Sequence, residues 1–275
     1  MPYKLNDTGE QKAIRASAPS IRFLKDLNDE FFIGGMIFDI GANVGHVSRY
    51  LLERGAGHVV GYEPHPVAFK SCSALHSEFN DSYTPIQAAV GNNSGKMFIT
   101  TSQSDDALGY FCNSILRKKV RRGLVANEVE VVAFKNEIEK HKPSGIKMDI
   151  EGSEFDILLN NEIPDHVKWI SLELHGLKDL GAYLMPFVIE RLFHCGLAPT
   201  KLPTLKAVDD RCTNSFFGSE VVNFTREGSI SSESQSMLLM LKGLGRNAYA
   251  KGYRPADEFK LALFERYYGE GSHGL

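Results

Sequence analysis

The sequence lacks several features that mark common classes of protein. Only four of its 275 residues are cysteine, and none forms a CxxC pair or a Cys/His cluster with zinc-site spacing. Residues 1–12 lack the apolar segment of a signal peptide, and no run approaches the roughly 20 apolar residues that a membrane span requires. These absences predict a cytoplasmic protein with free thiols and no membrane partner.

Excess positive charge is also missing. The net charge is −3, and the one dense basic run, at residues 117–122, is short. That run is interpreted either as a solvated face or as a patch that steers an anionic substrate. We therefore predict no nucleic-acid partner.

Short apolar strands alternate with helices over residues 36–196, which predicts a mostly parallel sheet with helices on both faces. The expected strands are residues 36–40, 58–63, 84–90, 96–100, 128–133, 145–150 and 168–174, and the expected helices are residues 21–32, 47–54, 66–79, 134–142, 154–159 and 183–195. Residues 101–128 are polar and irregular. The predicted division is an N-terminal arm and helix (1–34), a Rossmann-like domain (35–200) and a C-terminal segment (201–275). The last segment is expected to complete the sheet, or to form a lid or an oligomer contact such as a homodimer interface.

A loop containing two glycines, Asp39-Ile40-Gly41-Ala42-Asn43-Val44-Gly45, follows the first expected strand and opens a helix, as a nucleoside-binding loop does. Its spacing differs from the G-x-G-x-x-G of dinucleotide enzymes, which disfavours a nicotinamide oxidoreductase. Asp39 suits the ammonium group of a ligand with an amino-acid moiety. Glu63 ends the second strand, where a carboxylate accepts hydrogen bonds from ribose hydroxyls. Each feature alone is also compatible with a structural turn or a surface charge, but together they predict a nucleoside site.

Two further strand ends carry polar side chains. Asp149 and Glu151 lie at the carboxyl end of one expected strand, and Glu173 and His175 lie at the end of another. Open α/β sheets place their sites at these ends, and polar groups among apolar strands are costly unless they are paired or used. For His175, a neutral hydrogen-bonded residue at the sheet edge is the competing interpretation.

Four segments carry a resemblance to a known family: residues 38–45 (F-D-I-G-A-N-V-G), 62–66 (Y-E-P-H-P), 88–91 (A-A-V-G) and 147–154 (K-M-D-I-E-G-S-E). On these segments the chain resembles the FkbM family of S-adenosylmethionine-dependent methyltransferases, over about residues 35–196. The last segment is the most specific to that family. One departure is that residues 134–139 replace the acidic segment and leucine-rich helix that usually precede the fourth strand.

The resemblance implies an α/β class I methyltransferase fold, which is a Rossmann-like three-layer fold. Its mostly parallel seven-stranded sheet has helices on both faces and an antiparallel last strand. The resemblance also implies S-adenosyl-L-methionine as cofactor and methyl transfer to a hydroxyl of a small molecule such as a sugar or polyketide. The implied cofactor-binding residues are Asp39, Gly41, Asn43 and Gly45 for the methionine part, Glu63 for the ribose, Gln87, Ala88 and Ala89 beside the adenine, and Asp149 at the methyl-transfer end.

An acceptor hydroxyl must lose its proton as it attacks, and the candidate catalytic bases are His175, Asp149 and Glu151. Histidine has the ordinary pKa best suited to a base near neutrality. His46 is a weaker candidate that also reads as an ordinary first-turn helix residue. A divalent cation on Asp149, Glu151 and Glu173 is a less favoured alternative, so no metal is predicted. An NAD(P)-dependent oxidoreductase and a non-catalytic nucleoside-binding protein of the same fold stay open as other classes.

Overall fold

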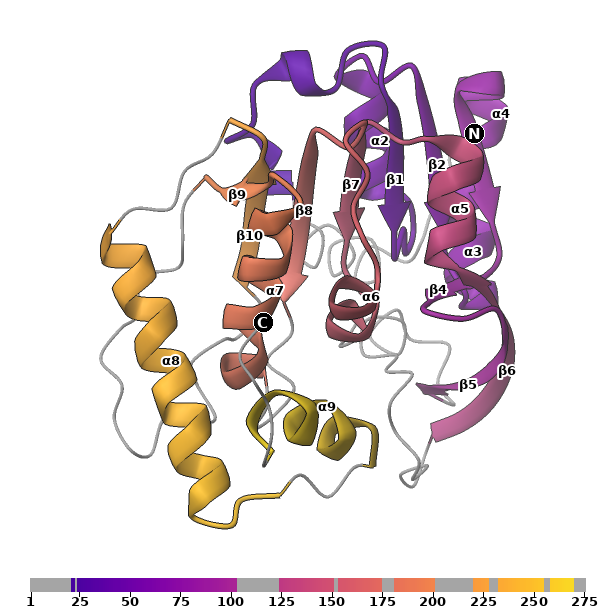
Figure 1. Ribbon diagram of the computed structural model, residues 1–275. Coiled ribbons are helices and arrows are strands. Elements are labelled where there is room, and N and C mark those ends of the chain that lie inside the picture. The colour runs from indigo at the N-terminus through magenta and orange to yellow at the C-terminus, as the bar shows by residue number, and fades with distance from the viewer. Residues whose placement is uncertain are drawn as a thin grey trace.

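The computed structural model describes residues 21–22, 24–102, 124–150, 153–174, 181–200, 220–227, 232–254 and 258–269. The strands of its main sheet are β1 (Met36–Ile40), β2 (His58–Tyr62), β3 (Tyr83–Ile86), β7 (Gly145–Met148), β8 (Trp169–Leu174), β9 (Ala198–Pro199) and β10 (Glu220–Thr225). Their order is β3-β2-β1-β7-β8-β10-β9 (Figure 1). The first five pair in parallel, whereas β10 is antiparallel to both neighbours. This arrangement confirms the class I methyltransferase fold expected from the sequence.

Helices cover both faces of this sheet. They are η1 (Asp29–Phe31), α2 (His46–Glu53), α3 (Pro66–Ser73), α4 (His76–Phe79), η2 (Asn80–Ser82), α5 (Phe134–His141), α6 (Glu154–Asn160), α7 (Gly181–His194), α8 (Ser232–Ala250) and α9 (Glu258–Tyr268). Because side chains alternate along a strand, Ile37 and Val59 pack with α2 on one face, whereas Phe38 and Val60 pack with α5, α6 and α7 on the other. The core therefore has two layers separated by the sheet. None of the helices within the described ranges is both long and apolar enough to cross a membrane.

The N-terminal part of the described chain closes one face of the sheet. The predicted helix over residues 21–32 is interrupted, and residues 29–31 form the 3-10 helix η1. Phe32 packs edge-on against Trp169 of β8 with ring centroids 5.5 Å apart, and the Trp169 indole N–H donates to the Phe31 carbonyl at 3.1 Å. The single tryptophan of the chain thus ties this segment to the middle of the sheet.

The predicted strand over residues 84–90 is two strands in the structure. The amide of Ala88 donates to the carbonyl of Ile86 at 3.0 Å, which turns the chain out of the main sheet after β3. Pro85, which has no N–H to offer a further strand, keeps β3 at the edge. The second strand, β4 (Ala89–Gly91), joins β5 (Gly95–Ser102) and β6 (Leu124–Ala133) in a separate sheet with the order β4-β6-β5. β6 thus starts inside the region predicted to be irregular.

The C-terminal segment contributes to the main sheet and to one of its faces. Strand β10 pairs with β8 from Glu220 opposite Leu174 to Thr225 opposite Trp169. Helices α8 and α9 pack on the α7 side of the sheet, and α9 lies toward the end of the molecule at which the parallel strands finish (Figure 1). The Tyr268 hydroxyl of α9 donates to the carbonyl of Tyr183 in α7 at 2.7 Å.

Arg226, directly after β10, joins three separate parts of the chain. Its guanidinium donates to the carbonyls of Val167 at 2.8 Å, Cys195 at 2.7 Å and Pro164 at 2.9 Å. These carbonyls lie before β8 and just after α7. Three charge-assisted hydrogen bonds therefore anchor the end of β10.

Candidate functional site

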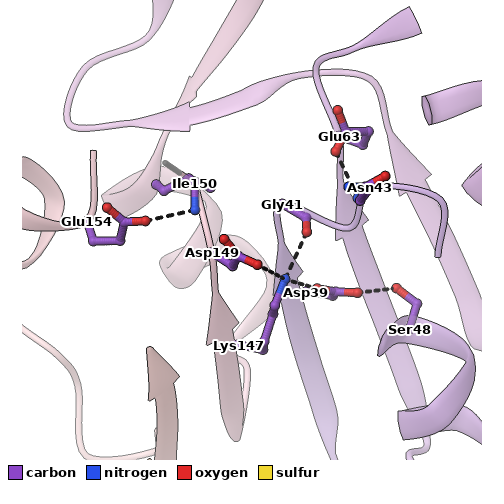
Figure 2. A network of polar contacts seen from close by, with 9 residues as sticks. All are labelled: Asp39, Gly41, Asn43, Ser48, Glu63, Lys147, Asp149, Ile150 and Glu154. Carbon is purple, nitrogen blue, oxygen red and sulfur yellow. Dashed lines mark hydrogen bonds and ion pairs between the residues drawn. The ribbon is translucent and has the colours of Figure 1, made fainter. Parts of the chain in front are cut away.

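The carboxyl ends of β1, β2 and β7 meet at one edge of the sheet. The amides of Gly41 and Ala42 donate to the carbonyl of Tyr62 at 3.0 and 2.9 Å, and the amide of Asp149 donates to the carbonyl of Ile40 at 3.0 Å. The loop after β1 is thereby held between the ends of β2 and β7 (Figure 2). This edge is where open α/β sheets place their ligands.

The loop after β1 uses three residues with positive φ: Gly41 (79°), Asn43 (51°) and Gly45 (90°). Asparagine is among the few residues with a side chain that adopt this conformation readily. A Cβ on Gly41 would overlap the carbonyl oxygen of Asp149, and a Cβ on Gly45 would lie 2.7 Å from Cδ1 of Leu75. The packing of the protein on itself and the positive φ therefore both require glycine at these two positions.

Glu63 lies directly after β2 with its carboxylate turned back toward the loop. One oxygen accepts from the amide of Asn43 at 2.8 Å, and the other accepts from the amide of His65 at 2.8 Å. His65 caps α3, since its Nδ1 accepts from the amide of Val67 at 3.2 Å. Burial raises the pKa of Glu63 to about 7, although both amide hydrogen bonds act in the opposite direction.

Lys147 lies at the centre of the site, although none of the roles expected from the sequence belongs to it. Its ammonium donates to the carbonyl of Gly41 at 2.8 Å and pairs with Asp39 at 3.3 Å and Asp149 at 3.7 Å (Figure 2). Asp39 also accepts from the Ser48 hydroxyl at 2.6 Å. Burial lowers the pKa of Lys147, but the carboxylates of Asp39 and Asp149 raise it above its ordinary value. A lysine inside the otherwise apolar strand β7 is the sequence signal that could have identified it.

Glu154, the first residue of α6, also has a structural contact that the sequence did not reveal. Its Oε1 accepts from the amide of Ile150 at 2.8 Å, although the side chain has no solvent exposure. The contact spans the turn after β7. Glu154 therefore fixes the path of the chain on both sides of residues 151–152.

The structure places Gln87 and Ala88 next to Glu63. The carbonyl of Ile86 accepts from the amides of both Glu63 and Ala88, each at 3.0 Å. Gln87 is exposed, whereas Ala88 is buried. The side-chain amide of Gln87 is thus accessible beside the predicted ribose site.

The predicted catalytic and metal-binding residues are only partly within the described chain. Asp149 is partly exposed, with 25% of its side-chain surface accessible, and Glu173 is buried near the end of β8. Glu151 and His175 lie outside the described residues. Within the described residues no three His, Cys, Asp or Glu side chains form a group that could hold a metal ion. The alternative set with Glu151 stays untested for this reason.

The charges at this edge suit a cationic ligand. Its described ionisable side chains include Asp39, Glu63, Lys147 and Asp149, and the carboxylate of Glu173 also acts on Lys147. Among these side chains the carboxyl groups outnumber the ammonium group. S-adenosylmethionine carries a sulfonium and an ammonium against one carboxylate, so the donor set fits this cofactor. In the placement that the family resemblance implies, Asp39 would lie toward its methionine part, Asp149 toward its methyl group and Glu63 toward its ribose.

Comparison with solved structures shows only distant similarity. Fibrillarin from Aeropyrum pernix with bound S-adenosyl-L-methionine shares 12% identity, with a TM-score of 0.42 over 75% of this chain and 73% of that chain. Magnesium protoporphyrin IX methyltransferase from Synechocystis with bound cofactor shares 11% identity, with a TM-score of 0.40 over 82% and 86%. A protein of the NADB-Rossmann superfamily from Streptococcus agalactiae shares 12%, with a TM-score of 0.41 over 96% and 94%.

The family comparison is decisive. No curated protein matches the sequence. The family model described as the methyltransferase FkbM domain matches residues 39–197. The match begins at Asp39, which opens the loop after β1 (residues 39–45, the cofactor loop), and it ends just after α7. Since this match spans more than half of the chain, the nicotinamide oxidoreductase alternative falls away. The protein belongs to the FkbM family and is an S-adenosylmethionine-dependent methyltransferase.

Proposed function

We propose that this enzyme transfers the methyl group to a hydroxyl oxygen of a small molecule. The observation that carries the proposal is the carboxylate of Asp149. It is held by Lys147 at the carboxyl end of β7, retains partial exposure, and lies beside the cofactor loop. A carboxylate in this position can accept the hydrogen of an acceptor hydroxyl and orient its oxygen.

An alcohol acceptor must be aligned with the methyl group, and it must also lose its hydroxyl proton. When bound, S-adenosylmethionine supplies the methyl group as an electrophile. The chain must align the acceptor oxygen and take its proton as it attacks. We assign the alignment to Asp149 and the role of base to His175, with Glu151 and Asp149 as alternatives.

The acceptor class and the compartment are part of the same proposal. The net charge of −3 disfavours a polyanionic substrate such as a nucleic acid. Cys72 and Cys195 are free thiols, which favours a reducing compartment such as the cytoplasm.

A panel of hydroxylated small molecules, incubated with enzyme and cofactor, tests the proposal. We expect S-adenosylhomocysteine to form with at least one alcohol, and the product to carry a methoxy group by NMR. N-methyl products, or methylation of RNA in a parallel panel, would contradict the acceptor class. Tight binding of S-adenosylhomocysteine without turnover on any acceptor would support the non-catalytic alternative instead.

Substitution of His175 separates catalysis from binding. His175→Ala is expected to lower turnover by about 10²- to 10⁴-fold, the usual contribution of a general base, while the affinity for S-adenosylhomocysteine is unchanged. Asp81→Asn, an exposed carboxylate in η2, is the control and should match the wild type. If His175→Ala retains full turnover, His175 is structural, and the base is Asp149 or Glu151.

A further inference from the structure

Lys147 contacts three parts of the site at once. Its partners are the side chain of Asp39 on β1, the carbonyl of Gly41 in the loop, and the side chain of Asp149 at the end of β7. Lys147 is only 3% exposed, so its ammonium interacts with these groups largely without competing water. We propose that Lys147 is a positioning residue, which fixes the cofactor loop and whose charge limits how strongly the site prefers a cationic cofactor over its neutral product. This inference rests on the proposed placement of the cofactor.

Lys147 holds the start of the loop in place through direct contacts. Gly41 has a φ of 79°, and its carbonyl points to the Lys147 ammonium at 2.8 Å. Asp39, two residues earlier, is held between Lys147 and the hydroxyl of Ser48. Lys147 therefore fixes the start of the loop against both α2 and β7. Without it, the loop would keep the main-chain bonds to Tyr62 and the bond from the Asp149 amide to Ile40, but Gly41 would lose its side-chain link to Asp149.

Lys147 also acts on the bound ligand through its positive charge. S-adenosylmethionine carries a sulfonium, whereas S-adenosylhomocysteine has an uncharged thioether at the same place. Asp39 and Asp149 attract the sulfonium, and Lys147, between them, offsets part of that attraction. Loss of the ammonium should therefore weaken both ligands through the loop, but the cationic one less. A purely structural residue would weaken both by the same factor.

Calorimetric titration of the full-length protein with each ligand at pH 8.5 tests this inference. In Lys147→Met we expect the affinity for S-adenosylhomocysteine to fall at least tenfold, and the ratio of the two affinities to shift about tenfold toward S-adenosylmethionine. The double variant Lys147→Met/Asp39→Asn restores the net charge but not the contacts. In the double variant, the ratio of the affinities for the two ligands should return to the wild-type value, while both affinities stay below those of the wild type.

Lys168→Met is the matched control. It removes one lysine charge at the opposite end of the neighbouring strand, where Lys168 is exposed and donates to the carbonyl of Asp165. Both affinities should equal those of the wild type. Wild-type affinities in Lys147→Met, or an unchanged ratio, would overturn the inference.

Two further outcomes are distinguishable. If Lys147→Met does not fold by circular dichroism, the double variant decides, because wild-type affinities in it would overturn the positioning role. If the wild-type protein itself binds neither ligand, the cofactor site and the proposed function fail, irrespective of Lys147.

Discussion

Glu63 is a carboxyl group almost removed from water and held by two backbone amides. Burial raises its pKa to about 7, so in the ligand-free protein a large fraction is protonated near neutrality. Only the ionised group offers both oxygens fully as acceptors to the ribose hydroxyls. The protonation state of a single residue therefore links the affinity for the cofactor to pH.

Glu63 should make folding stability fall as the pH rises. The native carboxyl keeps its proton up to about pH 7, whereas the unfolded one releases it near pH 4.5, so between these values the native state binds more protons. The extra proton bound by native Glu63 contributes about 3 kcal/mol to the free energy of unfolding. This contribution is fully present below pH 4.5 and is lost by about pH 7. Urea unfolding of the wild type and Glu63→Gln across this range measures it.

Glu63→Gln supplies the control for that measurement, because its side chain does not titrate. The glutamine amide faces the same backbone N–H groups at every pH. The substitution itself therefore changes the free energy of unfolding by an amount that does not depend on pH. The stability of the wild type relative to this variant should decrease between pH 4.5 and 7. A constant difference would show that the buried carboxyl titrates normally.

At this scale the sequence predicted the carboxylates but not their partners. Asp39, Glu63 and Asp149 interrupt or end apolar strands, so their position is visible in a linear pattern. The contact of Lys147 with Gly41 joins residues 106 positions apart. It depends on β1 and β7 being neighbours in the sheet, which no local pattern encodes.

At the scale of elements, the strongly apolar parallel strands and their order of alternation with helices were predictable. The break between β3 and β4 was not, because the residue types at 84–90 fit a single strand. Its cause is a single turn at Ile86–Ala88 and the pairing of β4 with β6, which lies more than 30 residues further along. The contact between α8 and α9 was equally invisible.

Substitutions of two glycines in α8 can test the contact between α8 and α9. A Cβ on Gly245 would overlap the ring of Tyr268 in α9, whereas a Cβ on Gly243 would meet nothing within 4 Å. Gly243→Ala should stabilise the protein by about 0.5–1 kcal/mol, because alanine loses less backbone freedom in a helix. Gly245→Ala should destabilise it by roughly 1–3 kcal/mol through overpacking.

Thermal or urea unfolding of both variants checks this pair, with each serving as the control for the other. Equal stabilisation by both substitutions would mean that α9 does not pack on α8 as described. Cofactor affinity should change in neither variant, since α8 contributes no residue to the proposed cofactor site.

At the scale of the whole molecule, the C-terminal segment is tied into the sheet by β10 and by Arg226. The Arg226 guanidinium satisfies three backbone carbonyls, which would lose their partners together. Arg226→Met should therefore lower the free energy of unfolding by about 2–4 kcal/mol.

Arg254 provides the matched comparison for Arg226. It also donates to backbone carbonyls, but those of Tyr249 and Tyr253, which are local in sequence and exposed. Arg254→Met should change stability by less than about 1 kcal/mol. Equal losses in the two arginine variants would contradict the anchoring role of Arg226.

The insertion of β10 between β8 and β9 also has a consequence for the synthesis of the protein. While the chain emerges from the ribosome, β8 exposes an unpaired edge until residue 225 has left the exit tunnel. The family match ends at residue 197, before that strand. An expression fragment cut at the family boundary would carry this open edge permanently, and it should self-associate more strongly than the full chain.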